Sequence, residues 1–246
     1  MVKFSVIMPA AGRSSRFGDR YYKKPFAPLA GRAVWLHSAE KFLNRPDCLQ
    51  LILVINPEDD EHFHMKFGAN AAIMGIDVVH GGAERADSVE KALARVKPQA
   101  DLVAVHDAAR PCLTDAWIND VLQAAAKTGA AMLGIPVAAT LKRVGKDNIV
   151  TETIDRENVW EAQTPQVFRR QLLLDAYAKR EGATSTDDAQ LVERLGHPVK
   201  IVRGSPLNLK ITTKEDQRLA EQVLKVLPKP TLDKPAHPFA DDDMWR

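Results

Sequence analysis

Short runs of apolar and β-branched residues alternate along the chain with longer segments in which apolar residues recur at helical spacing. The runs predict strands at residues 4–8, 51–55, 76–79, 102–105, 131–137 and 199–202. Several are apolar throughout, which is typical of a parallel sheet covered by helices on both faces. The other segments predict helices at residues 33–43, 87–96, 114–129, 189–196 and 213–227. This alternation predicts one α/β domain, residues 1–227, with a single doubly wound, mostly parallel sheet.

Two stretches break the alternation. Residues 137–159 are polar, and residues 140–144 and 148–154 alternate in character around a turn at residues 145–147. This pattern predicts a β-hairpin arm that protrudes from the sheet. Residues 228–246 have no periodicity and are rich in Pro and Asp, so we expect a disordered tail.

The composition excludes several classes of protein. Of the 246 residues, 45% are hydrophobic and 27% are charged, which excludes wholesale disorder. A net charge of +2 gives no reason to expect a nucleic-acid partner. The two cysteines, Cys48 and Cys112, cannot form a disulfide framework or a Cys-rich zinc site.

A membrane partner is not expected, because no apolar stretch approaches the ~20 residues that span a bilayer. The apolar segment at residues 4–11 superficially resembles a signal peptide, but it is short and contains Pro9. It is also followed directly by the arginines Arg13 and Arg16. We therefore interpret it as the first strand with its loop, and expect a cytoplasmic protein.

The loop after the first strand, residues 8–18 (MPAAGRSSRFG), contains the strongest chemical signal. Its small residues let backbone N–H groups approach an anion closely, and it lies where doubly wound sheets bind ligands. Positive charge surrounds it, from Arg13, Arg16, Lys23 and Lys24. The loop matches neither the Walker pattern nor G-x-G-x-x-G. It therefore predicts a distinct polyphosphate site; the alternative is a basic loop without function.

Further segments carry a family resemblance. They are residues 81–89 (GGAERADSV), 105–111 (VHDAARP), 164–166 (TPQ) and 208–210 (NLK). Together with residues 8–18, they resemble the motifs of the 2-C-methyl-D-erythritol 4-phosphate cytidylyltransferase family and follow one another in the same order as in that family. The resemblance extends from about residue 2 to residue 227. The resemblance implies a Rossmann-like nucleotidyltransferase fold. It also implies a Mg²⁺-assisted reaction in which CTP and methylerythritol phosphate give CDP-methylerythritol and pyrophosphate for non-mevalonate isoprenoid synthesis.

The resemblance also implies roles for individual residues. Arg16 and Lys24 match the pair that stabilises the transition state, and Arg156 and Lys210 match residues that position the acceptor phosphate. The loop that holds CTP matches Pro9, Ala10, Ala11 and Gly12, and the cytosine contacts match Gly82 and Ser88. Further ligand positions match Asp107, Ala108 and Arg110, and hydroxyls for the acceptor match Thr140, Thr164 and Thr186. No protein ligand of the metal is assigned.

Two positions depart from the family pattern. The family usually has Pro-Lys-Gln before an aromatic residue, whereas this chain has Lys23-Lys24-Pro25, and counting back from His37 favours Lys24. Ala83 replaces the Asp that is common after the two glycines, so one nucleotide contact is expected to be missing.

The resemblance further implies a homodimer in which the hairpin arm crosses to a second subunit and Arg156 serves the neighbour's site. The alternative for the arm is a solvated surface hairpin. Two alternatives for the function also stay open: a cytidylyltransferase for another polyol phosphate such as ribitol 5-phosphate, and a non-catalytic CTP-binding domain. His106, beside Asp107, is interpreted as structural, and Cys112 as a packing residue.

Overall fold

The computed structural model describes residues 2–12, 17–18 and 23–228. Their centre is a sheet of seven strands. In spatial order these are β11 (Lys200–Arg203), β7 (Ala130–Pro136), β10 (Trp160–Arg169), β6 (Leu102–Val105), β1 (Phe4–Pro9), β4 (Cys48–Ile55) and β5 (Asp77–His80). Every neighbouring pair is parallel except those of β10, which runs antiparallel to both β6 and β7.

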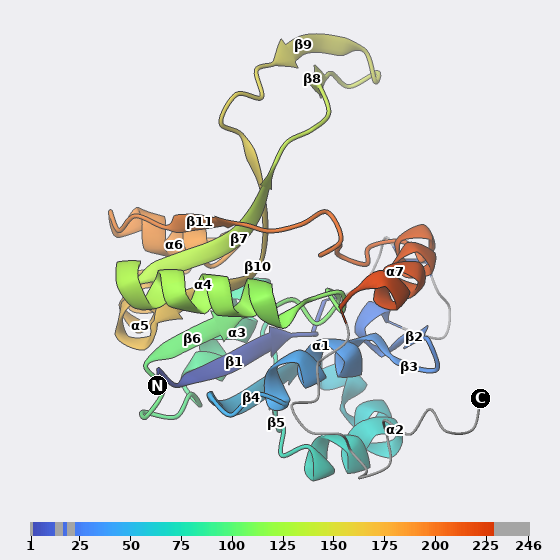
Figure 1. Ribbon diagram of the computed structural model, residues 1–246, viewed down its shortest axis with the longest axis vertical. Coiled ribbons are helices and arrows are strands. Elements are labelled where there is room, and N and C mark those ends of the chain that lie inside the picture. The colour runs from blue at the N-terminus through green and yellow to red at the C-terminus, as the bar shows by residue number, and fades with distance from the viewer. Residues whose placement is uncertain (1, 13–16, 19–22, 229–246) are drawn as a thin grey trace, which may run out of the picture.

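Helices cover both faces of this sheet (Figure 1). Buried residues of α1 (Val34–Leu43), α2 (Asp60–Ile73) and α4 (Asp115–Thr128) pack on one face, and those of α3 (Arg85–Leu93), α5 (Arg170–Ala178) and α6 (Ala189–Arg194) pack on the other. Strand β1 shows the reason, because Val6 faces the first core and Ile7 the second. A third core lies under α7 (Lys214–Val226). The predicted doubly wound, mostly parallel α/β fold is confirmed.

All six predicted strands and all five predicted helices occur within a few residues of their expected ends. The local signals explain this accuracy. Thr114 caps α4 by accepting from the backbone of Trp117, and Gly129 ends that helix with a positive φ. Thr213 and Asp216 form a capping box at the start of α7.

The described residues also form several smaller elements. They are the turns η1 (Lys24–Phe26) and η2 (Pro57–Asp59), and the short pair β2 (Pro28–Leu29) and β3 (Arg32–Ala33). Strands β8 (Leu141–Val144) and β9 (Val150–Ile154) form a separate antiparallel hairpin. Figure 1 shows this hairpin projecting from the ends of β7 and β10 as an arm. Among the described residues, no helix is long and apolar enough to cross a membrane.

The sequence patterns did not predict β10, α2 or α5. Pro165 argues against a strand, because proline interrupts the hydrogen-bond ladder. In the structure it lies where the register between β10 and β7 shifts, between Ala162 and Gln166. Helix α2 buries only a narrow stripe, Phe63, Phe67 and Ala71, within a polar segment.

Candidate active site

A cavity of about 550 Å³ opens at the carboxyl ends of the central parallel strands. Its walls come from residues that are distant in the sequence. They are residues 9–12 after β1, Lys24 and Pro25 in η1, Asn56 after β4, residues 82–85 and Ser88 around the start of α3, residues 107–109 after β6, and Lys210. Doubly wound folds bind ligands at this edge of the sheet.

Two glycines allow the loop after β5 to approach the loop after β1. A Cβ on Gly81 would lie 2.8 Å from the Cβ of Ala11 and 2.7 Å from Oγ of Ser88. A Cβ on Gly82 would overlap the side chain of Asp87. These contacts leave no room for a side chain at either position, so both glycines are required for the shape of the cavity.

The start of α3 forms the wall beside these glycines. Glu84 and Asp87 form a capping box, in which the Glu84 N–H donates to Oδ2 of Asp87 at 3.0 Å. Oγ of Ser88 accepts from the Gly82 N–H at 3.0 Å and donates to the Glu84 carbonyl at 3.0 Å. Ser88 therefore holds the Gly82 backbone against the helix, next to the cavity.

Asp107 lies at the centre of the basic side chains. Nζ of Lys210 lies 2.8 Å from its Oδ2, and Nε of Arg110 lies 3.3 Å from the same oxygen. Burial alone would raise the pKa of Asp107, but the positive charges of Lys210, Arg85 and Arg110 outweigh it and hold the pKa well below its ordinary value. The cavity thus contains a carboxylate that stays ionised at neutral pH, beside several cations.

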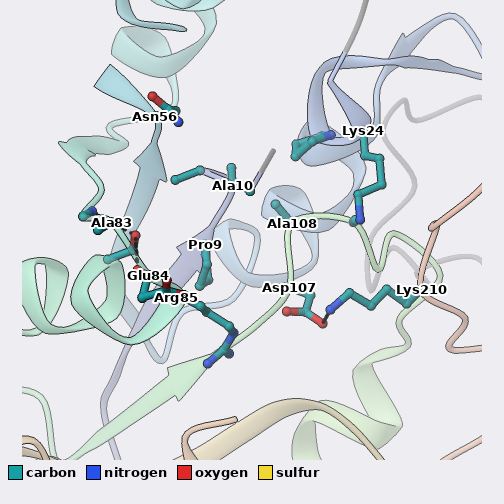
Figure 2. Close-up of a pocket in the computed structure, with 16 residues that line it drawn as sticks. Pro9, Ala10, Lys24, Asn56, Ala83, Glu84, Arg85, Asp107, Ala108 and Lys210 are labelled. Atoms are coloured by element: carbon teal, nitrogen blue, oxygen red, sulfur yellow. Dashed lines mark hydrogen bonds and ion pairs between the residues drawn. The ribbon is translucent and has the colours of Figure 1, made fainter. Parts of the chain in front are cut away.

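Arg85 is a wall residue to which the sequence patterns gave no role. Its Nη2 donates to the buried Asp188 at 2.7 Å, and Asp188 also accepts from the Tyr177 hydroxyl at 2.6 Å. Burial opposes the charge, but Asp188 and Asp107 outweigh it and raise the pKa of Arg85. In Figure 2, Lys24 and Lys210 lie on one side of Asp107 and Arg85 lies on the other. The motif at residues 81–89 contains Arg85 and was the available signal.

The structure distinguishes the two neighbouring lysines. Lys24, in η1, lines the cavity, whereas Nζ of Lys23 lies 2.8 Å from a carboxylate oxygen of Asp59. The preference for Lys24, obtained by counting along the sequence, agrees with this placement.

A buried asparagine supports the segment that carries Lys210. Nδ2 of Asn208 donates to the Thr164 carbonyl at 2.9 Å, and the Asn208 carbonyl accepts from Nη1 of Arg110 at 2.7 Å. Asn208 is fully buried, and its bond to the Thr164 carbonyl is shielded from water. This brace joins β10, the loop after β6 and the chain before Lys210. The motif NLK contained Asn208, but no role was predicted for it.

Most of the predicted site residues converge on this cavity. Those that line it are Pro9, Ala10, Ala11, Gly12, Lys24, Gly82, Ser88, Asp107, Ala108 and Lys210. Arg110 and Thr164 do not line the cavity, but each forms a hydrogen bond with Asp107. Thr186 is exposed, and Thr140 and Arg156 are exposed on the arm; none of these three lines the cavity. Arg16 lies outside the described residues.

Comparisons with known proteins agree with this geometry. The family model described as IspD: 2-C-methyl-D-erythritol 4-phosphate cytidylyltransferase matches residues 4–226. A relative of that name from Rhodopirellula baltica is 46% identical over 231 residues, covering 89% of this chain and 94% of its own. Another from Pelotomaculum thermopropionicum is 41% identical, covering 92% and 95%.

Solved structures show the same likeness in three dimensions. The crystal structure of 2-C-methyl-D-erythritol 4-phosphate cytidylyltransferase from Thermus thermophilus superposes with a TM-score of 0.73 at 31% identity. The match covers 89% of this chain and 98% of the other. From its sequence and its fold alike, the chain belongs to the 2-C-methyl-D-erythritol 4-phosphate cytidylyltransferase family.

Proposed function

We propose that this enzyme transfers the cytidylyl group of CTP to 2-C-methyl-D-erythritol 4-phosphate, forming CDP-methylerythritol and pyrophosphate for non-mevalonate isoprenoid synthesis. One structural observation supports the proposal independently of family membership. Lys24 and Lys210, far apart in the sequence, line the same cavity as the small-residue loop 9–12. A cavity of about 550 Å³ that combines such a loop with several cations suits a nucleoside triphosphate.

The reaction itself explains why the site is basic. A phosphate oxygen of the acceptor attacks the α-phosphorus of CTP, and the bond from that phosphorus to the bridging oxygen of pyrophosphate breaks. No covalent enzyme intermediate is needed, so the protein positions two anions and neutralises the growing charge. Two such anions repel each other strongly in a site of low dielectric unless cations lie between them.

The cationic residues divide this task. Lys24, with Arg16, is proposed to stabilise charge on the α-phosphoryl group in the transition state. Lys210, with Arg156, is proposed to position the acceptor phosphate. The backbone of residues 9–12 and the wall at Gly82 and Ser88 would hold the nucleotide.

Mg²⁺ is proposed as the cofactor. Among the described residues, no group of three His, Cys, Asp or Glu side chains could hold a metal ion by itself. Mg²⁺ does not require such a group, because it is commonly bound by one or two carboxylates together with substrate phosphates. Asp107 lines the cavity and stays ionised at neutral pH, so its carboxylate and the triphosphate together would hold the ion. The ion would supply positive charge against the phosphates.

We also propose that the enzyme acts as a homodimer in the cytoplasm, with the arm reaching the second subunit. The arm is only a two-stranded hairpin, which is marginally stable alone in water. It also exposes apolar side chains, with Val144 48%, Ile149 66% and Val150 54% accessible. Arg156, just beyond β9, is exposed and does not line its own cavity. A partner subunit would cover the exposed apolar side chains of the arm, and Arg156 would reach the partner's cavity.

An acceptor assay tests the activity. Purified protein with CTP, Mg²⁺ and methylerythritol phosphate should release pyrophosphate, and chelation of the metal should stop the release. Ribitol 5-phosphate is the control acceptor, and we expect a much lower kcat/KM for it. No release at any concentration of methylerythritol phosphate, or faster turnover of ribitol 5-phosphate, would contradict the proposal.

A further inference from the structure

His106 directly follows β6 and precedes Asp107, yet it does not line the cavity. Its side chain is fully buried and packs against Phe42, with ring centroids 5.1 Å apart. Nε2 of His106 lies 3.0 Å from the carbonyl oxygen of Arg110, and Nδ1 lies 3.1 Å from Oγ1 of Thr164. Both ring nitrogens are thus bonded to residues that also contact Asp107.

The partners of His106 decide where its hydrogen lies. A carbonyl oxygen only accepts, so Nε2 must carry a hydrogen and donate it to Arg110. With its hydrogen on Nε2, the neutral imidazole has a lone pair on Nδ1, and this buried nitrogen accepts. The Thr164 hydroxyl therefore donates its single hydrogen to Nδ1.

The oxygen of that hydroxyl has a second function. Oγ1 of Thr164 accepts from the backbone N–H of Asp107 at 3.1 Å, and this contact is buried. The peptide of Asp107 is thus linked through Thr164 to His106, and His106 is linked back to Arg110. The short loop that presents the Asp107 carboxylate is held at both ends.

We infer that His106 and Thr164 are positioning residues for cytidylyl transfer: His106 orients the Thr164 hydroxyl, which fixes the backbone of Asp107 and so places its carboxylate beside Lys210. This inference rests on the proposed function. It revises the expectation that Thr164 donates its hydroxyl hydrogen to the acceptor, because Thr164 donates this hydrogen to Nδ1 of His106 instead.

Matched variants at Thr164 test the inference. Thr164→Val keeps the shape but removes the hydroxyl and leaves the Asp107 N–H without its acceptor, so kcat should fall about tenfold. The KM for the acceptor should change by no more than about twofold, because no contact to the acceptor is lost. Thr164→Ser keeps the hydroxyl and should retain most of kcat. A raised acceptor KM with unchanged kcat would overturn the inference.

Two further measurements separate positioning from general destabilisation. Hydrogen exchange of the Asp107 amide, followed by NMR, should be faster in Thr164→Val than in wild type and unchanged in Thr164→Ser. This readout needs no turnover, so it tests the hydrogen bond even if the proposed activity is wrong; equal exchange in all three proteins would refute the bond.

The second measurement is the coupling of the two residues. His106→Leu removes the acceptor of the Thr164 hydroxyl and should also lower kcat. If the residues act in one chain, the double variant His106→Leu, Thr164→Val should be no slower than the slower single variant. Additive losses would overturn the inference. If His106→Leu does not fold, His106→Asn is used, because its amide oxygen can still accept from Thr164, and it should keep a higher kcat than Thr164→Val.

Discussion

At the scale of single residues, position relative to the cavity separates side chains of the same type. Lys23 and Lys24 are adjacent and carry the same charge, but Lys23 pairs with Asp59 while Lys24 lines the cavity. An ion pair outside the cavity cannot act on the substrates, whereas a cation aimed at charge that develops in the transition state contributes much to the rate.

We therefore expect Lys24→Ala to lower kcat by about 10²- to 10³-fold, the usual effect of removing one group that stabilises developing charge. Lys23→Ala is the matched control and should keep kcat within about twofold, because Lys23 pairs with Asp59 and does not line the cavity. Steady-state kinetics with CTP and methylerythritol phosphate measure both. Equal losses in the two variants would remove the role assigned to Lys24.

At the scale of elements, the start of α3 determines one wall of the cavity. Asp87 accepts from the Glu84 N–H and from Nη2 of Arg180, at 3.0 and 2.5 Å. The hydrogen bond from Arg180, followed by that from Glu84, holds the pKa of Asp87 below its ordinary value of 3.8. The cap is therefore strongest when Asp87 is ionised.

Asp87→Ala should lower the free energy of unfolding at pH 7 by about 1 kcal/mol, because it removes one of the two side chains of the capping box. Because the folded pKa lies below the unfolded one, this contribution is complete above about pH 4 and is lost as pH falls through the folded pKa. The difference from wild type should therefore shrink at pH 3.5, as measured by urea unfolding. Glu90→Ala, which contacts Arg180 without capping the helix, is the control and should cost less than about 0.5 kcal/mol. A difference that does not depend on pH would contradict this account.

At the scale of the whole molecule, the arm decides whether the site is complete in one chain. Arg156 and Lys24 are assigned to the same reaction, but only Lys24 lines the cavity of its own chain. If the arm crosses to a partner, a mixed dimer of Arg156→Ala and Lys24→Ala chains contains one site with both residues intact.

Each variant alone should be nearly inactive, whereas chains mixed in equal amounts and allowed to exchange should recover about a quarter of wild-type activity, since half of the dimers are mixed and each has one intact site. Light scattering should show a dimer throughout. The control is a mixture of Lys24→Ala with Lys210→Ala, in which both residues belong to one cavity and each mixed dimer has no intact site. No recovery in the first mixture, or an active wild-type monomer, would exclude the shared site.

Local patterns in the sequence were sufficient to predict the layered α/β fold and most of the residues that line the cavity. Periodicity reports which face of an element is buried, and that property is local, so the strands and helices with clear patterns were predicted correctly. The loop at residues 8–18 and the motifs at 81–89 and 105–111 indicated the phosphate chemistry for a similar reason. Small residues and cations act there through the local backbone and charge.

The contacts between segments that are remote in the sequence became visible only once the chain was folded. Strand β10 pairs with β6 and β7 despite Pro165, because its ladder shifts register where the proline lies. That pairing brings Thr164 to Asp107 and His106, and it lets Asn208 brace the segment before Lys210. Arg85 acquires its place in the wall from Asp188, which is distant in the sequence. Such contacts depend on register between remote segments, which no local pattern encodes.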